Sequence, residues 1–245
     1  MKEKITVYIP TFKRWDSIIT HKLIPEAVVV CPESQVEKYL EVNPNLNILA
    51  CPDGIEGNIA RKRNWIKSQC KTDYLIMIDD DIKGFQKIVN TKQITMSTDE
   101  IWYMFEQGFQ LMEDLGTVLW GVNLNNDPKC YREYSPFSML SPVLGPFTAQ
   151  KNVKTFWYDE RLPLKEDYDL SLQVLQKYHK VLRLNRYSYV TTHLTNADGG
   201  CVDYRTMVRE EEQNQLLQKK WGKKIVKYNI EKSINPIIKV PLKGI

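Results

Sequence analysis

Short apolar runs that favour β-structure alternate with helical segments over the first eighty residues, and this alternation limits the fold more than any other feature. The expected strands are residues 5–10, 27–31, 47–51 and 74–78, and the expected helices are residues 34–40, with Ser34 as the N-cap, and 57–70. Strands that alternate with helices pair in parallel and carry helices on both faces of their sheet. The sequence therefore predicts an α/β protein with a mainly parallel sheet.

The rest of the chain is less regular. We expect helices at residues 100–115, 169–178 and 204–221, the last one charged and on the surface, and strands at residues 117–123, 181–184 and 187–191. No element is predicted beyond residue 223. With 245 residues, 42% of them hydrophobic, the chain can bury one sizeable core, so we expect a single domain over residues 1–245.

Composition excludes several classes of protein. The 34 basic and 30 acidic residues give a net charge of +4, which permits a polyanionic partner without requiring one. Five cysteines without a CxxC pair predict neither a disulfide framework nor a zinc site. No apolar run approaches the roughly 18 to 20 residues of a membrane span, and the first residues do not resemble a signal peptide. We expect a cytoplasmic protein.

Three consecutive carboxylates follow the apolar strand at residues 74–78. Because side chains alternate along an extended chain, Asp79 and Asp81 should face the same side while Asp80 points elsewhere. Ligands of such sheets bind beyond the carboxyl ends of the strands. Two carboxylates there suit Mg²⁺ or Mn²⁺, which would neutralise the leaving diphosphate of an activated donor. The alternative is a solvated loop that caps a helix.

The helix after Gly57 is rich in basic residues. A glycine at a helix start allows close approach of a ligand to the backbone, and the free N–H groups there favour anions. The helical spacing turns Ile59, Trp65 and Ile66 inward and leaves residues 61–63 and 67 on a polar face. The basic residues thus predict either phosphate binding or a solvated surface.

Two further segments carry candidate groups. Glu166 and Asp167 precede the helix at 169–178, where carboxylates usually cap, and from this segment alone a cap is the preferred interpretation over a general base. His193 follows the strand at 187–191 and is either a structural histidine or a further ligand of an ion such as Mn²⁺.

Taken in order, these segments resemble the inverting family 2 glycosyltransferases and their GT-A relatives, over residues 5 to about 193. The resemblance is carried by residues 7–14, by the glycine-to-arginine-asparagine helix at 57–65, by the metal strand at 75–81 and by the acceptor segment at 156–172. It implies a GT-A (Rossmann-like) fold, with residues 1–85 binding the nucleotide-sugar, residues 86–222 binding the acceptor, and a tail at 223–245.

The resemblance also implies roles for single residues, with a UDP-sugar as the expected donor and Mn²⁺ or Mg²⁺ as the cofactor. Asp167 becomes the candidate base, with Glu166 second. The donor-binding candidates are Pro10, Thr11, Arg14, Asn58, Arg61, Arg63, Asp79 and Asp80, and the metal candidates are Asp79, Asp81 and His193.

The acceptor stays open. The compact size and residues 193–200 resemble the phage-type enzymes that glycosylate hydroxymethylated DNA bases, relatives of the base J glucosyltransferase. DNA with such pyrimidines is therefore one acceptor hypothesis, supported by the aromatic residues Tyr131, Tyr134, Phe137, Phe156, Trp157 and Tyr158. A saccharide or lipid acceptor is the alternative. Two other classes are a nucleotidyltransferase, whose glycine-rich, lysine-containing loop is missing after the first strand, and a nucleic-acid-binding module without catalysis.

Overall fold

A mixed sheet of ten strands forms the centre of the structure, a computed structural model that describes residues 1–191 and 204–241. Four strands pair in parallel in the order β3-β2-β1-β4. They are β1 (Ile5–Pro10), β2 (Val28–Pro32), β3 (Asn47–Cys51) and β4 (Tyr74–Ile78), joined by the helices α1 (Val36–Val42) and α2 (Ile59–Gln69). These strands and their parallel pairing confirm the prediction to within one residue at each end.

Strands that pair mostly antiparallel, apart from the parallel pair β7 and β10, enlarge the sheet, and the sequence did not reveal most of them. From β4 the order continues through β9, β7, β10, β5 and β6, and β8 pairs with β10. They are β5 (Ile82–Val89), β6 (Lys92–Thr95), β7 (Leu119–Asn123), β8 (Phe137–Ser138), β9 (Phe147–Lys151) and β10 (Leu182–Thr191). The two strands predicted at 181–184 and 187–191 are the single strand β10, whose register shifts between Leu184 and Ser188. The mixed α/β sheet with its helices confirms the predicted fold class.

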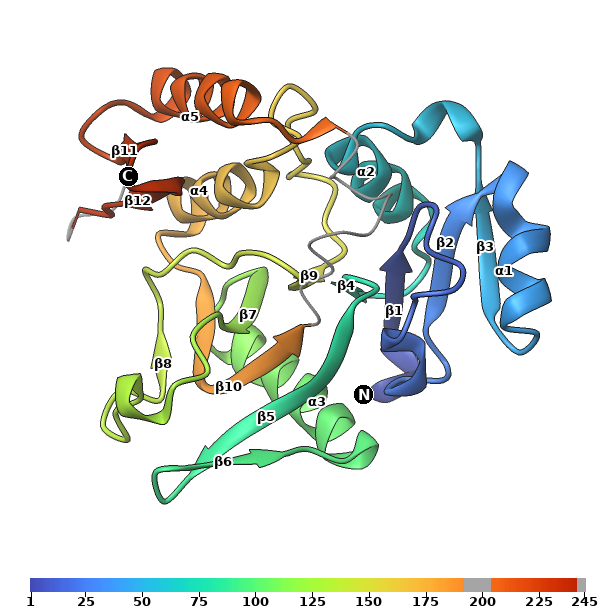
Figure 1. Ribbon diagram of the computed structural model, residues 1–245. Coiled ribbons are helices and arrows are strands. Elements are labelled where there is room, and N and C mark those ends of the chain that lie inside the picture. Colours follow the sequence, from blue (N-terminus) through green and yellow to red (C-terminus); the bar gives the residue numbers. More distant parts are fainter. Residues whose placement is uncertain (192–203, 242–245) are drawn as a thin grey trace.

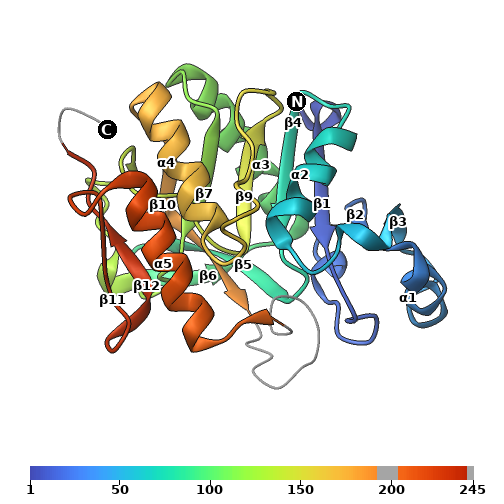
Figure 2. The same ribbon diagram turned by 90° about the horizontal axis from the view of Figure 1, so that it is seen from above.

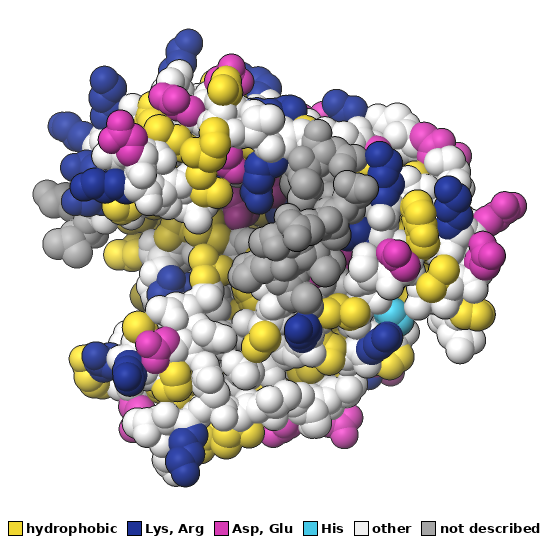
Figure 3. All heavy atoms as spheres, viewed as in Figure 1, with side chains coloured by type: hydrophobic (Ala, Val, Ile, Leu, Met, Phe, Trp, Pro, Cys, Tyr) yellow, Lys and Arg dark blue, Asp and Glu magenta, His cyan; other side chains and the backbone are white. Residues whose placement is uncertain are grey.

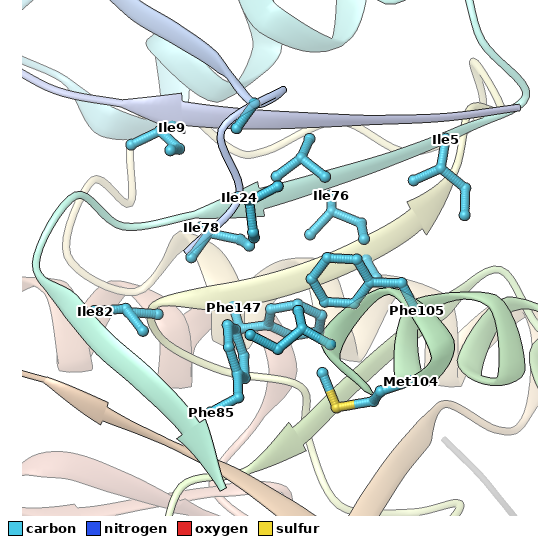
Figure 4. Close-up of a cluster of buried hydrophobic side chains, with 14 of the residues drawn as sticks. Ile5, Ile9, Ile24, Ile76, Ile78, Ile82, Phe85, Met104, Phe105 and Phe147 are labelled. Atoms are coloured by element: carbon cyan, nitrogen blue, oxygen red, sulfur yellow. The ribbon is translucent and has the colours of Figure 1, made fainter. Parts of the chain in front are cut away.

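Helices cover both faces of this sheet (Figures 1 and 2). One face packs α1 and α3 (Thr98–Asp114), and the other packs α2, α4 (Glu166–Tyr178) and α5 (Met207–Trp221). Strand β4 serves both layers, because Ile76 and Ile78 join the first cluster while Leu75 and Met77 join the second. Figure 4 shows the first cluster, in which Phe85, Phe105 and Phe147 gather beneath the isoleucines of the sheet.

The C-terminal part differs from the prediction. The last predicted helix begins later, at Met207, and it is not a plain surface helix, because Glu210, Asn214 and Leu217 are buried. Beyond it, where no element was expected, β11 (Val226–Asn229) and β12 (Ser233–Ile238) form an antiparallel hairpin that contacts α5. Within the described ranges, no helix has the length and apolar character needed to cross a membrane.

The orientation predicted for α2 is wrong for three of its basic residues. Lys62, Arg63 and Lys67 are 3%, 4% and 1% exposed, whereas Trp65 is only partly buried. Each buried cation has polar partners: Lys62 donates to Glu56 and to the Thr11 carbonyl, and Lys67 donates to the Phe156 carbonyl. Burial of a charged side chain is tolerated when it is paired in this way.

The start of α1 is also different from the expectation. Gln35 occupies the N-cap, and Ser34 lies one residue earlier in a short 3-10 turn, where its hydroxyl donates to Asp53 at 2.9 Å. The predicted Ser34 cap is therefore wrong, because this hydroxyl ties the end of β2 to the end of β3.

Gly108 in α3 is a helical glycine whose replacement by alanine should destabilise the protein. Replacing a helical glycine with alanine normally stabilises a protein by roughly 0.5–1 kcal/mol. At Gly108 a Cβ atom would lie 2.5 Å from the ring of Trp120, a fully buried side chain. We expect Gly108→Ala to lower the free energy of unfolding by about 1–3 kcal/mol, the usual cost of overpacking a core, as measured by urea denaturation.

The matched control is Gly54→Ala, since nothing lies within 4 Å of its added Cβ atom and its backbone needs no positive φ. This variant should unfold within about 0.5 kcal/mol of the wild type. A stabilised Gly108→Ala variant would contradict the packing of α3 against β7.

Candidate active site

A cavity of about 620 Å³ lies beyond the carboxyl ends of β1 and β4. Its walls are the loop after β1, the carboxylates after β4, the segment that precedes β9, and the first turns of α2 and α4. In Figure 3 acidic and basic side chains gather where this face is hollowed, next to the grey atoms. Cavities of this size hold small ligands and cofactors, and the position is where open α/β sheets bind them.

The three consecutive aspartates divide as the alternation predicted. All three line the cavity, but Asp79 and Asp81 are partly exposed, whereas Asp80 is 4% exposed. Both carboxylate oxygens of Asp80 have partners, because Thr11 Oγ1 donates to one at 2.5 Å and Arg14 Nη1 to the other at 2.8 Å. Asp80 therefore fastens the loop after β1 to the loop after β4.

The residues present fit a hard divalent cation. Burial raises the pKa of Asp81 to about 6, and repulsion from Asp79 and Asp80 adds to this shift. Among the described residues no group of three or more His, Cys, Asp and Glu side chains is arranged to hold a metal. Mg²⁺ needs less from a protein, since it takes one or two carboxylates together with waters and substrate phosphates. Asp79 and Asp81 meet that need, and His193 lies outside the described residues.

Arg63 joins the two sides of the cavity. Its guanidinium donates from Nη2 to Asp79 at 3.3 Å and from Nη1 to Glu166 at 2.9 Å, and it lies over the ring of Tyr158. Burial by itself lowers the pKa of this group, but its attraction to the carboxylates, Glu166 first, outweighs burial, raises the pKa and keeps the group charged. A fixed cation thus stands between the first carboxylate after β4 and the start of α4.

The acidic start of α4 does not cap the helix. The N-cap is Lys165, no side-chain cap bond is present, and both Glu166 and Asp167 lie inside the first turn, so the preferred cap interpretation is wrong. Asp167 lines the cavity and accepts a bond from the Gly145 amide at 2.8 Å, while Glu166 is held by Arg63. Burial raises the pKa of both carboxyl groups, and a raised pKa suits a general base.

The segment around Lys165 is fixed from the C-terminal part of the chain. Lys165 and Glu210 of α5 are each 1% exposed and form an ion pair of 2.5 Å, and Arg205 approaches the other oxygen of Glu210 at 2.9 Å. Arg205 also lines the cavity. The residue directly before the two candidate bases therefore has its counter-charge in another helix.

The donor-binding candidates are not all in the cavity. Pro10, Thr11, Arg14, Asn58 and the residues already described line it. Asn58 also caps α2 by accepting from the Arg61 amide. The side chain of Arg61 is absent from the described lining and bonds instead to the Gly54 carbonyl and Glu160.

Several lining residues escaped the sequence analysis. Lys62 and Glu56 form an ion pair in the lining, and Leu144, Gly145 and Tyr189 line the cavity as well. Burial raises the pKa of Tyr189, and Asp79, Asp167 and Asp81 raise it further. No sequence signal marked Tyr189, because it looks like any aromatic residue of a strand. Gly145 has a positive φ of 74°, and its position directly before a proline is a sequence signal that indicates a turn.

Solved structures share this fold. A mannosyltransferase from Pyrobaculum calidifontis in complex with GDP-Man and Mn²⁺ is 12% identical, with a TM-score of 0.60 over 89% of this chain and 64% of that one. Glucosyl-3-phosphoglycerate synthase from Mycobacterium tuberculosis is 11% identical, with a TM-score of 0.53 over 88% of this chain and 79% of that one. TarS 1–349 from S. aureus in complex with UDP-GlcNAc is 13% identical, with a TM-score of 0.51 over 90% of this chain and 74% of that one. At these identities the likeness establishes the fold alone.

The coverage of these structures is uneven. In another TarS 1–349 structure the matched part is 59% of that chain, so this chain spans about three fifths of its length. A comparison with curated proteins found no match.

A family comparison goes further than the structures. The model of the family described as TET-Associated Glycosyltransferase matches residues 5–200, well over half of the 245 residues. That range contains the loop after β1, the carboxylates after β4, the start of α4 and most of the other residues that line the cavity. The chain belongs to the TET-associated glycosyltransferase family.

Proposed function

We propose that the protein is a metal-dependent glycosyltransferase that moves a sugar from a nucleoside diphosphate to an acceptor hydroxyl. The observation that carries the proposal is the meeting of Asp79, Asp81 and Asp167 in one cavity, around the buried cation Arg63. Family membership supports it. A module that only binds nucleic acid would gain nothing from carboxylates in such a cavity, because phosphates are repelled by them.

The donor half, residues 1–85, would bind the nucleotide-sugar. Pro10, Thr11 and Arg14, at and after the end of β1, line the cavity, and so do Gly57 and Asn58 at the start of α2, where a helix N-terminus favours an anionic diphosphate. Asp79 and Asp81 would hold Mn²⁺ or Mg²⁺, which, when bound, supplies positive charge to the departing diphosphate. A UDP-sugar remains the donor that we propose.

Asp167 would act as the general base from the acceptor half, residues 86–222. Its carboxylate accepts the proton of the acceptor hydroxyl while that oxygen bonds to the sugar carbon and the bond from this carbon to the diphosphate breaks. The Gly145 amide orients Asp167. Glu166 is less suited, since its partner is the charged Arg63, whereas the partners of Asp167 are the neutral amides of Gly145 and Tyr168.

For the acceptor we propose a hydroxymethylated pyrimidine in DNA. Such a base must leave the duplex to enter a cavity and stack on aromatic side chains. Tyr134, Phe137 and Trp157 are exposed and Tyr131 is partly exposed, but none of these four is among the described residues that line the cavity, so the support for this acceptor is the family description, TET-associated. Phe156 and Tyr158 are 5% and 2% exposed in the core, so they are wrong as stacking residues. Their burial favours the alternative, a saccharide or lipid acceptor.

The first prediction concerns the metal. Mn²⁺ should raise the Tm of the wild type at pH 7.5, and this shift should disappear in Asp81→Asn together with about a hundredfold or more of the turnover. Because the pKa of Asp81 is raised to about 6, its ionised form destabilises the metal-free fold above that pH. Because a protonated Asp81 cannot bind Mn²⁺, the Tm shift caused by Mn²⁺ should shrink as the pH falls through about 6.

Asp73→Asn is the control, since Asp73 is exposed and stands just before the other end of β4. It should keep both the Tm shift and the activity. Full activity of Asp81→Asn in EDTA would refute the metal-dependent proposal.

The second prediction separates transfer from donor binding. Asp167→Asn should lower the rate of transfer by about 10²–10⁴-fold, because it removes the base, while stabilisation by UDP with Mn²⁺ stays at the wild-type level. Rapid-quench transfer rates and thermal shifts measure the two. Glu160→Gln, an exposed carboxylate, serves as control. An equal loss of UDP affinity would assign Asp167 to the donor and leave Glu166 as the remaining candidate base.

The third prediction tests the acceptor. Enzyme, Mn²⁺ and a pool of UDP-, GDP- and TDP-sugars are incubated with DNA that contains 5-hydroxymethylcytosine or 5-hydroxymethyluracil, and the digested nucleosides are analysed by mass spectrometry. We expect a hexosylated or pentosylated nucleoside, and DNA binding that weakens as salt rises through counterion release. An enzyme that hydrolyses its donor but modifies no nucleoside would refute the DNA acceptor alone.

A further inference from the structure

Tyr189 places a hydroxyl group in the cavity that the proposed mechanism does not use. The residue belongs to β10, its side chain is partly buried, and it lines the cavity. A Cβ atom on Gly145 would lie 3.1 Å from the Tyr189 hydroxyl oxygen, which puts this oxygen against the backbone of Gly145. Gly145 is also the residue whose amide binds Asp167. The hydroxyl and the candidate base thus flank the same glycine.

The ring and the hydroxyl of Tyr189 have different surroundings. The ring packs against the buried cluster beneath the sheet. Within the described part of the chain, the hydroxyl has no hydrogen-bond partner. The charges of Asp79, Asp167 and Asp81 raise its pKa. Tyrosine hydroxyls that serve the fold normally have a partner. A phenylalanine would pack equally well, so the hydroxyl is the part that the fold leaves unexplained.

The sheet order tells which substrate this hydroxyl meets. The donor end of the cavity is built by the loop after β1 and the start of α2, whereas β10 is separated from β1 by β4, β9 and β7. Around the Tyr189 hydroxyl the lining includes Leu124 and Gly145, and the carboxylates of Asp79, Asp167 and Asp81 lie near enough to raise its pKa. Asp167, which would meet the acceptor hydroxyl, binds the same Gly145, and a few polar groups in a partly apolar wall are typical of a site that orients a ligand.

We propose that the Tyr189 hydroxyl hydrogen-bonds the acceptor beside the group that Asp167 deprotonates, and so sets the orientation of the acceptor. This inference rests on the proposed glycosyl transfer. A site that hydrogen-bonds its substrate discriminates strongly against a misplaced one, because its polar group would otherwise be left unpaired. Water, which needs no such orientation, should react with the donor without help from Tyr189.

The test compares two reactions of Tyr189→Phe, which removes only the hydroxyl. Transfer is measured with DNA containing 5-hydroxymethylcytosine or, if the wild type leaves it unmodified, with soluble saccharide acceptors, and donor hydrolysis is measured without acceptor. We expect kcat/KM for transfer to fall about tenfold to hundredfold, the effect of one lost hydrogen bond in a closed site. Donor hydrolysis and the thermal shift with UDP and Mn²⁺ should stay within twofold of the wild type.

Tyr187→Phe is the matched control, because Tyr187 lies two residues earlier in β10, packs against the same core and is absent from the described lining. It should keep both reactions. Transfer by Tyr189→Phe within twofold of the wild type would overturn the inference, and so would an equal fall of transfer and hydrolysis, which would assign the hydroxyl to the donor. A wild type without either reaction would instead refute the proposed function.

Discussion

The site depends on one buried cation more than on any other group. Arg63 is 4% exposed and contacts both Asp79 after β4 and Glu166 in α4. Removing one partner of a buried charge leaves the other uncompensated, which costs far more than an exposed pair contributes. The planar guanidinium also fixes the directions of its hydrogen bonds, since two of its nitrogens donate to two different carboxylates at once. The spacing between the two acidic segments is therefore set by an arginine that belongs to neither.

The middle aspartate has a comparable role within the acidic triplet. Asp80 binds Thr11 and Arg14 through its side chain, and its carbonyl accepts from the amides of Ile19 and Thr20. The residues on either side of it can face the cavity because their backbone is held from behind by the β1–β2 connection. A cation site that must discriminate by geometry benefits from such rigid support.

Sequence reasoning recovered the parts of the molecule that local pattern determines. Strands β1 to β4 alternate with helices, and Asp79, Asp80 and Asp81 alternate along one backbone, so both followed from spacing. The antiparallel strands β5 and β9 were missed because their partners, β10 and β4, make the pairing evident only in three dimensions. Periodicity also placed Lys62 and Lys67 outside, since it counts lysine as polar and has no knowledge of Glu56 or the Phe156 carbonyl. Tyr189 could be recognised only from the fold. The role proposed for the start of α4 came from resemblance, since the segment alone favoured a cap.

The ion pair between Lys165 and Glu210 bears on how the chain is divided into parts. The family match ends at residue 200, yet the counter-charge of the lysine that precedes Glu166 and Asp167 lies ten residues further on. A fragment cut at the family boundary would lose this counter-charge together with the residues of α5, such as Leu217, that pack in the second cluster. The smallest autonomous unit of this protein is consequently larger than the region by which its family is recognised, and recombination of family members at that boundary would have to exchange α5 together with the segment it neutralises.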